Sequence, residues 1–229
     1  MKKIRGLLAF AFILLVIPFV IALLYLRPAK GRAIRQAYAK LFIRFLGLRV
    51  ELVGELDPNA KMIMLNHQSF LDVIFMEAIH PKDLCWIAKK ELGNTPLYGH
   101  ALKAPRMILI DREDKRGLLF LLKETKERLE KNRVLAIFPE GTRSKGGERF
   151  LPFKSGAKVI AEKFHLPIQP IVVVGTRSIF DLAKLSVGGG KARFITLPTR
   201  SPLSSPSWYE EMKEEMQQRY KEELLSLSI

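Results

Sequence analysis

Two short stretches of this sequence carry side chains that could do chemistry. In the first, residues 62 to 72 (MIMLNHQSFLD), an apolar run is followed by His67 and, five residues later, by Asp72. If a strand ends before His67 and a helix begins at Ser69, Asp72 lies in the first helical turn, where its carboxylate can accept a hydrogen bond from the imidazole. This pairing fixes one tautomer and leaves the other ring nitrogen free to take a proton from a hydroxyl. The alternative is that Ser69 and Asp72 form a capping box and His67 is a turn residue.

The second stretch, residues 138 to 144 (FPEGTRS), also follows an apolar run. Gly141 suits a turn with positive φ, so the chain is expected to reverse direction here. Arg143 on such a loop offers a planar fork of donors for a phosphate, with Thr142 and backbone N–H groups nearby. These residue types favour a phosphate site, and the alternative is a surface turn in which Glu140 and Arg143 form an ion pair.

The elements that position these residues alternate between strands and helices. Apolar runs predict buried strands, and longer stretches between them predict helices. The predicted strands are 62–65, 84–88, 107–110, 134–138 and 168–174, and the predicted helices are 71–79, 117–130, 156–164 and 208–225. The alternation predicts one α/β layered domain with a mostly parallel or mixed sheet flanked by helices.

A long apolar segment precedes this domain. Leu7 to Leu26 is interrupted only by Pro18 and is long enough to cross a bilayer core of about 30 Å. A signal peptide is the competing interpretation, but the apolar run is too long and no small-residue cleavage site follows it. We expect the segment to be retained and to span the bilayer or to enter one leaflet.

The next segment, Gly31 to Leu48, has apolar residues at steps of three and four with basic residues between them. This periodicity predicts an amphipathic helix that lies on a membrane surface or packs on the globular domain. The sequence thus predicts two parts, membrane-anchoring helices over residues 1–48 and a catalytic domain over residues 49–229.

The charge of the chain narrows the choice of partner. The net charge is +15 over 229 residues, and the first fifty residues hold ten basic side chains and no acidic one. Basic residues beside an apolar anchor favour an anionic phospholipid bilayer. A nucleic-acid partner is not expected, because the basic residues are interleaved with aliphatic rather than aromatic ones. The lone cysteine, Cys85, excludes an intramolecular disulfide and favours a cytoplasmic location.

The two reactive stretches resemble the motifs of a known family. NHQSFLD is similar to the Asn-His-x-x-x-x-Asp motif, and FPEGTRS to the Phe-Pro-Glu-Gly-Thr-Arg-Ser motif, of the 1-acyl-glycerol-3-phosphate acyltransferases of the bacterial PlsC type. Two further blocks, at 88–112 and 166–170, resemble the same family, so the likeness covers roughly residues 48 to 200. His100, Pro105 and Gln169 depart from the family's pattern.

The resemblance implies a glycerol-phosphate acyltransferase-like fold and a specific reaction. A fatty acyl group would pass from an acyl carrier protein or coenzyme A thioester to the sn-2 hydroxyl of 1-acyl-glycerol-3-phosphate (lysophosphatidic acid). The product would be phosphatidic acid for phospholipid synthesis, made at the cytoplasmic face of the bacterial inner membrane. His67 would deprotonate the hydroxyl and Asp72 would orient the imidazole. The residues implied to bind the substrate are Glu140, Gly141, Thr142, Arg143, Arg112 and Lys90.

Other chemistries lack the residues that they need. The sequence has no Gly-x-Ser-x-Gly motif, and Cys85 lies in a strand-like run, so direct transfer without an acyl-enzyme is expected. His80, His100 and His165 have no partners at metal-ligand spacing, so we expect neither a metal nor another cofactor. Two alternatives stay open: acylation of another lysophospholipid or a lipid amine, and a non-catalytic basic scaffold at the membrane surface.

Overall fold

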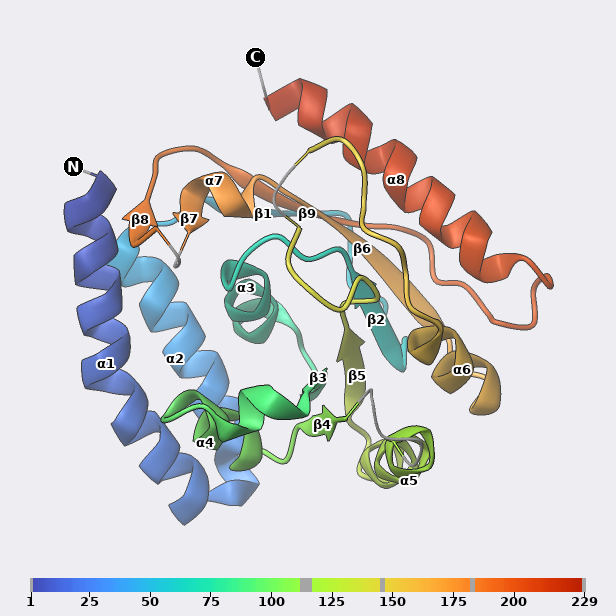
Figure 1. The fold of residues 1–229 in the computed structure, drawn as a ribbon, viewed down its shortest axis with the longest axis horizontal. Helices are drawn as coiled ribbons and strands as arrows, with labels where there is room; N and C mark the ends of the chain where they lie inside the picture. Colours follow the sequence, from blue (N-terminus) through green and yellow to red (C-terminus); the bar gives the residue numbers. More distant parts are fainter. Residues whose placement is uncertain (1, 112–116, 145–146, 182–183, 228–229) are drawn as a thin grey trace.

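The computed structural model describes residues 2–111, 117–144, 147–181 and 184–227. In this part of the chain, a seven-stranded sheet has the order β1-β9-β6-β2-β5-β3-β4, and β7 and β8 form a separate pair (Figure 1). The strands are β1 (Val50–Val53), β2 (Met62–Leu65), β3 (Leu84–Lys89), β4 (Ile108–Ile110), β5 (Val134–Ile137), β6 (Ile168–Val174), β7 (Phe180–Asp181), β8 (Ser186–Val187) and β9 (Ala192–Thr196). The helices are α1 (Lys2–Leu26), α2 (Gly31–Leu46), α3 (Leu71–Ile79), α4 (Tyr98–Lys103), α5 (Gly117–Glu130), α6 (Ser155–Lys163), α7 (Thr176–Ile179) and α8 (Trp208–Leu227), with 3-10 turns η1 (Pro28–Lys30) and η2 (Lys90–Asn94).

The sheet is mixed, and its centre is parallel. β2 pairs in parallel with β5 and β6, and β3 pairs in parallel with β5 and β4, whereas β6 and β9 are antiparallel. Every residue of β2, β5 and β6 is buried, which explains why these strands are continuous apolar runs rather than alternating ones. Because the central strands are parallel, the residues that follow β2, β3 and β5 meet at one edge of the sheet.

Helices cover both faces of the sheet. In Figure 1, α3 lies between the sheet and the pair α1 and α2, and α5, α6 and α8 lie on the opposite side. The larger hydrophobic core joins the central strands to α8 through Trp208 and Met212, both of which are fully buried. The predicted α/β fold with a mixed sheet flanked by helices is therefore confirmed.

The N-terminal helices form a second core with the rest of the chain. Phe42 and Ala39 of α2 pack in one cluster with Leu71 and Ile74 of α3, and Leu24 of α1 belongs to the same cluster. By length and composition, α1 is the helix among the described residues that could cross a membrane, a criterion that N-terminal signal sequences also meet. The division into anchoring helices (1–48) and a catalytic domain (49–229) stays a prediction.

One face of α2 packs on the domain, as one interpretation of this segment predicts, and its contact with a membrane surface stays a prediction. Tyr38 and Phe42 are buried against the protein, whereas Leu41 and Phe45 are about half exposed. The helix ends at Leu46, two residues earlier than predicted, because Gly47 takes up the left-handed conformation of a C-cap with φ of 58°. α2 thus packs on the domain and still presents apolar side chains outward.

Candidate active site

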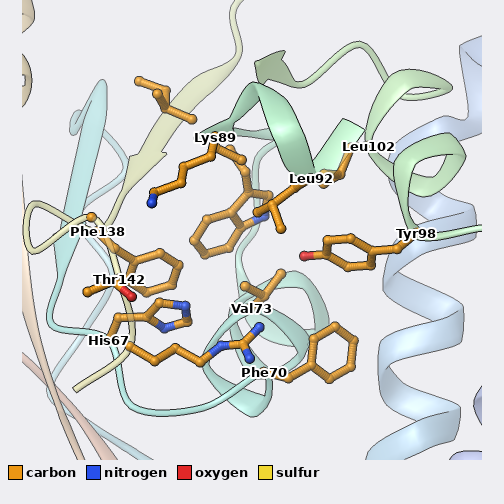
Figure 2. A pocket seen from close by; sticks show the side chains of 14 residues that line it. His67, Phe70, Val73, Lys89, Leu92, Tyr98, Leu102, Phe138 and Thr142 are labelled. Carbon is orange, nitrogen blue, oxygen red and sulfur yellow. The ribbon is translucent and has the colours of Figure 1, made fainter. Parts of the chain in front are cut away.

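A cavity of about 390 Å³ lies at the edge of the sheet where β2, β3 and β5 end (Figure 2). His67 follows β2, Lys89 ends β3 and Phe138 follows β5, and all three line the cavity. Helices α3 and α4 close the other side with Phe70, Val73, Tyr98 and Leu102. The cavity therefore collects residues that are far apart in the sequence at the carboxyl edge of the parallel strands.

His67 and Asp72 form the predicted pair. The Nδ1 atom of His67 lies 2.8 Å from Oδ2 of Asp72, and the two side chains are 12% and 0% exposed. With Nδ1 engaged, Nε2 is the ring nitrogen left for a substrate. The same Oδ2 atom accepts the backbone N–H groups of Gln68 at 2.7 Å and Ser69 at 2.9 Å. Asp72 therefore contacts the imidazole and holds the backbone of the loop just before α3 at the same time.

The predicted N-cap of α3 is one residue off. The helix begins at Leu71, so its N-cap is Phe70 rather than Ser69. The Ser69 hydroxyl accepts the N–H of Leu71 at 3.3 Å and donates to the carbonyl of Phe180 at 2.5 Å. It ties the loop between β2 and α3 to the chain after α7.

Asn66 fixes the residue just before His67. Its side-chain amide donates to the carbonyl of Val173 at 2.8 Å, and its amide oxygen accepts the N–H of Val173 at 2.7 Å. The side chain thus replaces the strand ladder between β2 and β6 after β2 has ended. The backbone at His67 is held against β6 for this reason.

Glu140 lies on the loop after β5 and contacts the backbone of His67 rather than lining the cavity. One carboxylate oxygen accepts the backbone N–H of His67 at 2.7 Å, and the other accepts that of Leu151 at 2.9 Å. Glu140 is only 3% exposed, and burial raises its pKa while these two hydrogen bonds lower it. Gly141 has φ of 72°, as a turn at this point requires. The N–H of Ser144 donates to the carbonyl of His67 at 2.8 Å, so the two loops are joined on both sides of His67.

Two cations face the cavity. Arg143 is exposed, lines the cavity with Gly141 and Thr142, and makes no hydrogen bond or ion pair with another described residue. The Lys89 side chain reaches into the cavity in Figure 2, where Tyr98 points in from the opposite side. Lys90 is not among the lining residues, and its ammonium group lies 3.3 Å from Asp111.

The structure therefore brings most of the predicted site residues together. His67, Gly141, Thr142 and Arg143 line the cavity, Asp72 and Glu140 contact His67 from behind, and Lys90 lies outside. Arg112 lies outside the described residues. Sequence reasoning missed Lys89, although it is the residue directly before Lys90 in the same motif block.

A second cavity of about 420 Å³ adjoins the first and is lined almost entirely by aliphatic and aromatic side chains. It lies between α1, α2 and α3, with Ile13, Ile17 and Leu24 of α1 in its wall. The two cavities share the lining residues Phe70, Val73, Trp86, Leu92, Tyr98, Leu102 and Arg143. An apolar compartment therefore opens onto the histidine site.

Metal ligands do not gather anywhere in the described ranges: no group of three or more His, Cys, Asp or Glu side chains there is placed to hold an ion. The α/β fold thus places a histidine paired with a buried carboxylate, two cationic side chains and an adjoining apolar cavity close together. Such a site can activate a hydroxyl on an amphiphilic molecule.

Comparison with known proteins gives the family. Residues 49–174 match the acyltransferase family. The chain is 54% identical over 191 residues to a 1-acyl-sn-glycerol-3-phosphate acyltransferase of Helicobacter pylori, covering 83% of this chain and 80% of that protein. It is 34% identical over 189 residues to a protein of the same name from Cocos nucifera, covering 82% of this chain and 60% of that protein. The chain therefore belongs to the acyltransferase family and, within it, to the 1-acyl-sn-glycerol-3-phosphate acyltransferases.

A solved structure agrees with this membership at the level of the fold. The crystal structure of the lysophosphatidic acid acyltransferase PlsC from Thermotoga maritima superposes with a TM-score of 0.75 at 24% identity, covering 100% of this chain and 98% of that one. The family resemblance of the two motifs is thus confirmed, and the chain is an acyltransferase enzyme.

Proposed function

We propose that this enzyme transfers a fatty acyl group from a thioester of acyl carrier protein or coenzyme A to the sn-2 hydroxyl of lysophosphatidic acid. The observation that carries the proposal is the His67–Asp72 pair in a cavity that also holds Arg143 and Lys89 and opens onto an apolar chamber. The printed names of the relatives support the same acceptor.

His67 is the general base in this proposal. Its Nε2 atom takes the proton of the acceptor hydroxyl while the hydroxyl oxygen attacks the thioester carbonyl. Asp72 stabilises the imidazolium that forms. When the tetrahedral intermediate collapses, the carbon–sulfur bond breaks and the thiolate receives the proton from His67. Base catalysis of this kind raises the reaction rate by a factor on the order of a hundred to ten thousand. The proposed reaction uses no metal or other cofactor.

The phosphate of the acceptor is assigned to the free cations of the cavity. Arg143 can bind two phosphate oxygens at once, with Thr142 and the backbone of Gly141 beside it. We assign the second cation to Lys89 rather than Lys90, because only Lys89 lines the cavity. Glu140 acts as a brace on the backbone of His67. Arg112 stays a proposed phosphate contact from the sequence.

The apolar chamber is assigned to an acyl chain, and the N-terminal helices to membrane attachment. The chamber wall includes Ile13 and Ile17 of α1, whose outer face exposes Leu15 and Phe19 at 69% and 72%. An apolar helix that forms the chamber wall while touching lipid gives an acyl chain a short path from the bilayer. We place the site at the cytoplasmic face of the bacterial inner membrane, where both acidic carriers would meet a basic surface.

The test uses the purified full chain in phospholipid vesicles with lysophosphatidic acid and a radiolabelled acyl thioester. Wild type is expected to form phosphatidic acid, and His67→Ala is expected to lose at least about a hundredfold in kcat. Arg143→Ala should raise the KM for lysophosphatidic acid, whereas Arg149→Ala, an exposed arginine outside the cavity, should not.

Two outcomes would contradict the proposal: no phosphatidic acid from wild type, or an equal kcat for wild type and His67→Ala. Equal rates on lysophosphatidic acid and on a neutral lysolipid or lipid amine, both insensitive to Arg143→Ala, would favour the broader acyltransferase. Binding to vesicles without any acyl transfer would favour the alternative of a non-catalytic scaffold at the membrane surface.

A further inference from the structure

Two contacts hold the His67 imidazole, one at the edge of the ring and one on its face. The hydrogen bond from Nδ1 to Asp72 fixes the edge, but the angular tolerance of one hydrogen bond leaves the ring some freedom to tilt. The Phe138 ring removes this freedom: its centroid lies 3.7 Å from that of the imidazole, and the two planes differ by 13°. The direction of Nε2 into the cavity therefore depends on where Phe138 lies.

Phe138 is in turn supported by Trp86 of β3. The two rings stack with centroids 5.2 Å apart and planes within 17° of each other. The indole Nε1–H of Trp86 donates to Oε1 of Glu77 at 2.8 Å. This hydrogen bond fixes the orientation of the indole, because rotating the ring would break it and leave a buried N–H donor and a buried carboxylate oxygen unpaired.

Glu77 is itself anchored by the N-terminal helices. Its second oxygen, Oε2, accepts from Nε of Arg35 at 3.1 Å, and the two side chains are 9% and 10% exposed. Arg35 belongs to α2 and also pairs with Asp83 at 2.5 Å. Burial raises the pKa of Glu77, and Arg35 and the indole N–H act against this shift. Both carboxylate oxygens are thus in use, one toward α2 and one toward Trp86.

We propose that Glu77 is a positioning residue for acyl transfer: it fixes the indole of Trp86, and the Trp86–Phe138 stack then sets the plane of the His67 imidazole. This inference rests on the proposed role of His67 as the base. Helix α3 carries both Asp72 and Glu77, so one helix determines the edge and the face of the same ring. The ion pair with Arg35 makes that arrangement depend on α2 being docked.

The first test compares turnover in three variants. Glu77→Met keeps the length of the side chain and removes the acceptor, and Trp86→Phe keeps a ring and removes the donor. Each is expected to lower kcat about tenfold, because catalysis is sensitive to sub-ångström placement of the base. Glu77→Gln retains an oxygen for the indole N–H and is expected to keep more than half of kcat, with a lower melting temperature because its NH₂ group then faces the Nε–H of Arg35.

Asp83→Asn is the matched control. It also takes a charged partner from Arg35, but Asp83 has no contact with Trp86 among its hydrogen bonds and ion pairs. Its kcat is expected to stay within about twofold of wild type even where the melting temperature falls. The double variant Glu77→Met with Trp86→Phe should be no slower than either single variant, because both act through one hydrogen bond.

The second test does not depend on turnover. With isotope-labelled histidine, the four histidines give separate ring signals, and that of His67 is assigned from its loss in His67→Ala. Stacking on Phe138 shifts the His67 ring protons upfield. This upfield shift should become smaller in Glu77→Met and Trp86→Phe, and it should stay as in wild type in Glu77→Gln and Asp83→Asn.

These readouts separate failure of this inference from failure of the proposed function. If wild type forms no phosphatidic acid, the histidine signals still decide whether Glu77 sets the ring plane. The inference is overturned if Trp86→Phe, the variant that leaves the ion pair intact, keeps both kcat and the His67 ring shift of wild type. It is also overturned if the losses of the two single variants multiply to about a hundredfold in the double variant.

Discussion

Replacing Asp72 with Asn asks whether the carboxylate orients His67 or only holds the loop before α3. The Asn carbonyl oxygen can occupy the place of Oδ2 and still accept from His67 Nδ1 and from the N–H groups of Gln68 and Ser69. Its NH₂ group then falls at Oδ1, a buried atom without a hydrogen-bond partner in the described part of the chain. The substitution therefore keeps the hydrogen bonds to the loop and the geometry of the pair, and it removes the charge.

The size of the effect follows from the hydrogen bond that loses its charge. Hydrogen bonds to charged groups contribute about 1.5–3 kcal/mol, and this one strengthens as the imidazole becomes an imidazolium in the transition state. A loss of that size lowers kcat by about 10- to 150-fold. The KM for lysophosphatidic acid should change by less than about twofold, because Asp72 is buried and does not line the cavity.

Asp72→Ala is the companion variant that also removes the hydrogen bonds to the loop before α3. It leaves the N–H groups of Gln68 and Ser69 buried without an acceptor, at a cost of about 1–3 kcal/mol each. Its free energy of unfolding should therefore fall by about 2–6 kcal/mol, whereas that of Asp72→Asn should fall much less. Initial rates in vesicles and denaturant unfolding followed by circular dichroism measure the two effects. A wild-type kcat in Asp72→Asn would refute the catalytic role and leave Asp72 as a support for the loop before α3.

Three further changes test the surroundings of the site. Lys89→Met should raise the KM for lysophosphatidic acid at least about fivefold, whereas Lys90→Met, whose lysine pairs with Asp111 outside the cavity, should not; equal KM values would contradict the assignment. Glu140→Gln places an amide donor against a backbone N–H, so both kcat and the free energy of unfolding should fall, the free energy by about 1–3 kcal/mol. Wild-type rates in this variant would exclude the role of Glu140 as a brace on the His67 backbone. Burial lowers the pKa of His80 from its ordinary value of 6.5, so the native state binds fewer protons than the unfolded state. Stability is therefore lost as the pH falls below that value. His80→Gln should flatten this part of the curve of melting temperature against pH, and an unchanged slope would contradict this prediction.

The long elements of the fold are predictable because burial alone sets their pattern. The bounds of α3 and α5 match the predicted 71–79 and 117–130, and β6 matches 168–174, since each combines a clear period or a continuous apolar run with breakers at its ends. The short elements are held by tertiary contacts instead. β1 is a half-buried edge strand that exists through its pairing with β9, and α4 is six residues long. Neither leaves a period long enough to detect.

The site is predictable where its residues are close in the sequence. His67 and Asp72 are five residues apart, so strand and helix geometry suffice to bring them together. Lys89 and Lys90 differ by one position and not by type, and the choice between them depends on where β3 ends and η2 begins. Glu140 and Phe138 reach His67 across more than seventy residues of chain, so their roles as brace and stacking partner appear only when two loops meet at the sheet edge.

The two interpretations of the His67–Asp72 segment are not exclusive, and the geometry explains why. Three donors converge on one carboxylate oxygen, and two of them are backbone N–H groups of the loop that leads into α3. Those two hold the carboxylate where it cannot rotate away, so the third hydrogen bond, to His67, costs little reorganisation during the reaction. The hydrogen bonds to the loop are therefore the means by which a short, buried side chain becomes a rigid partner for the His67 imidazole.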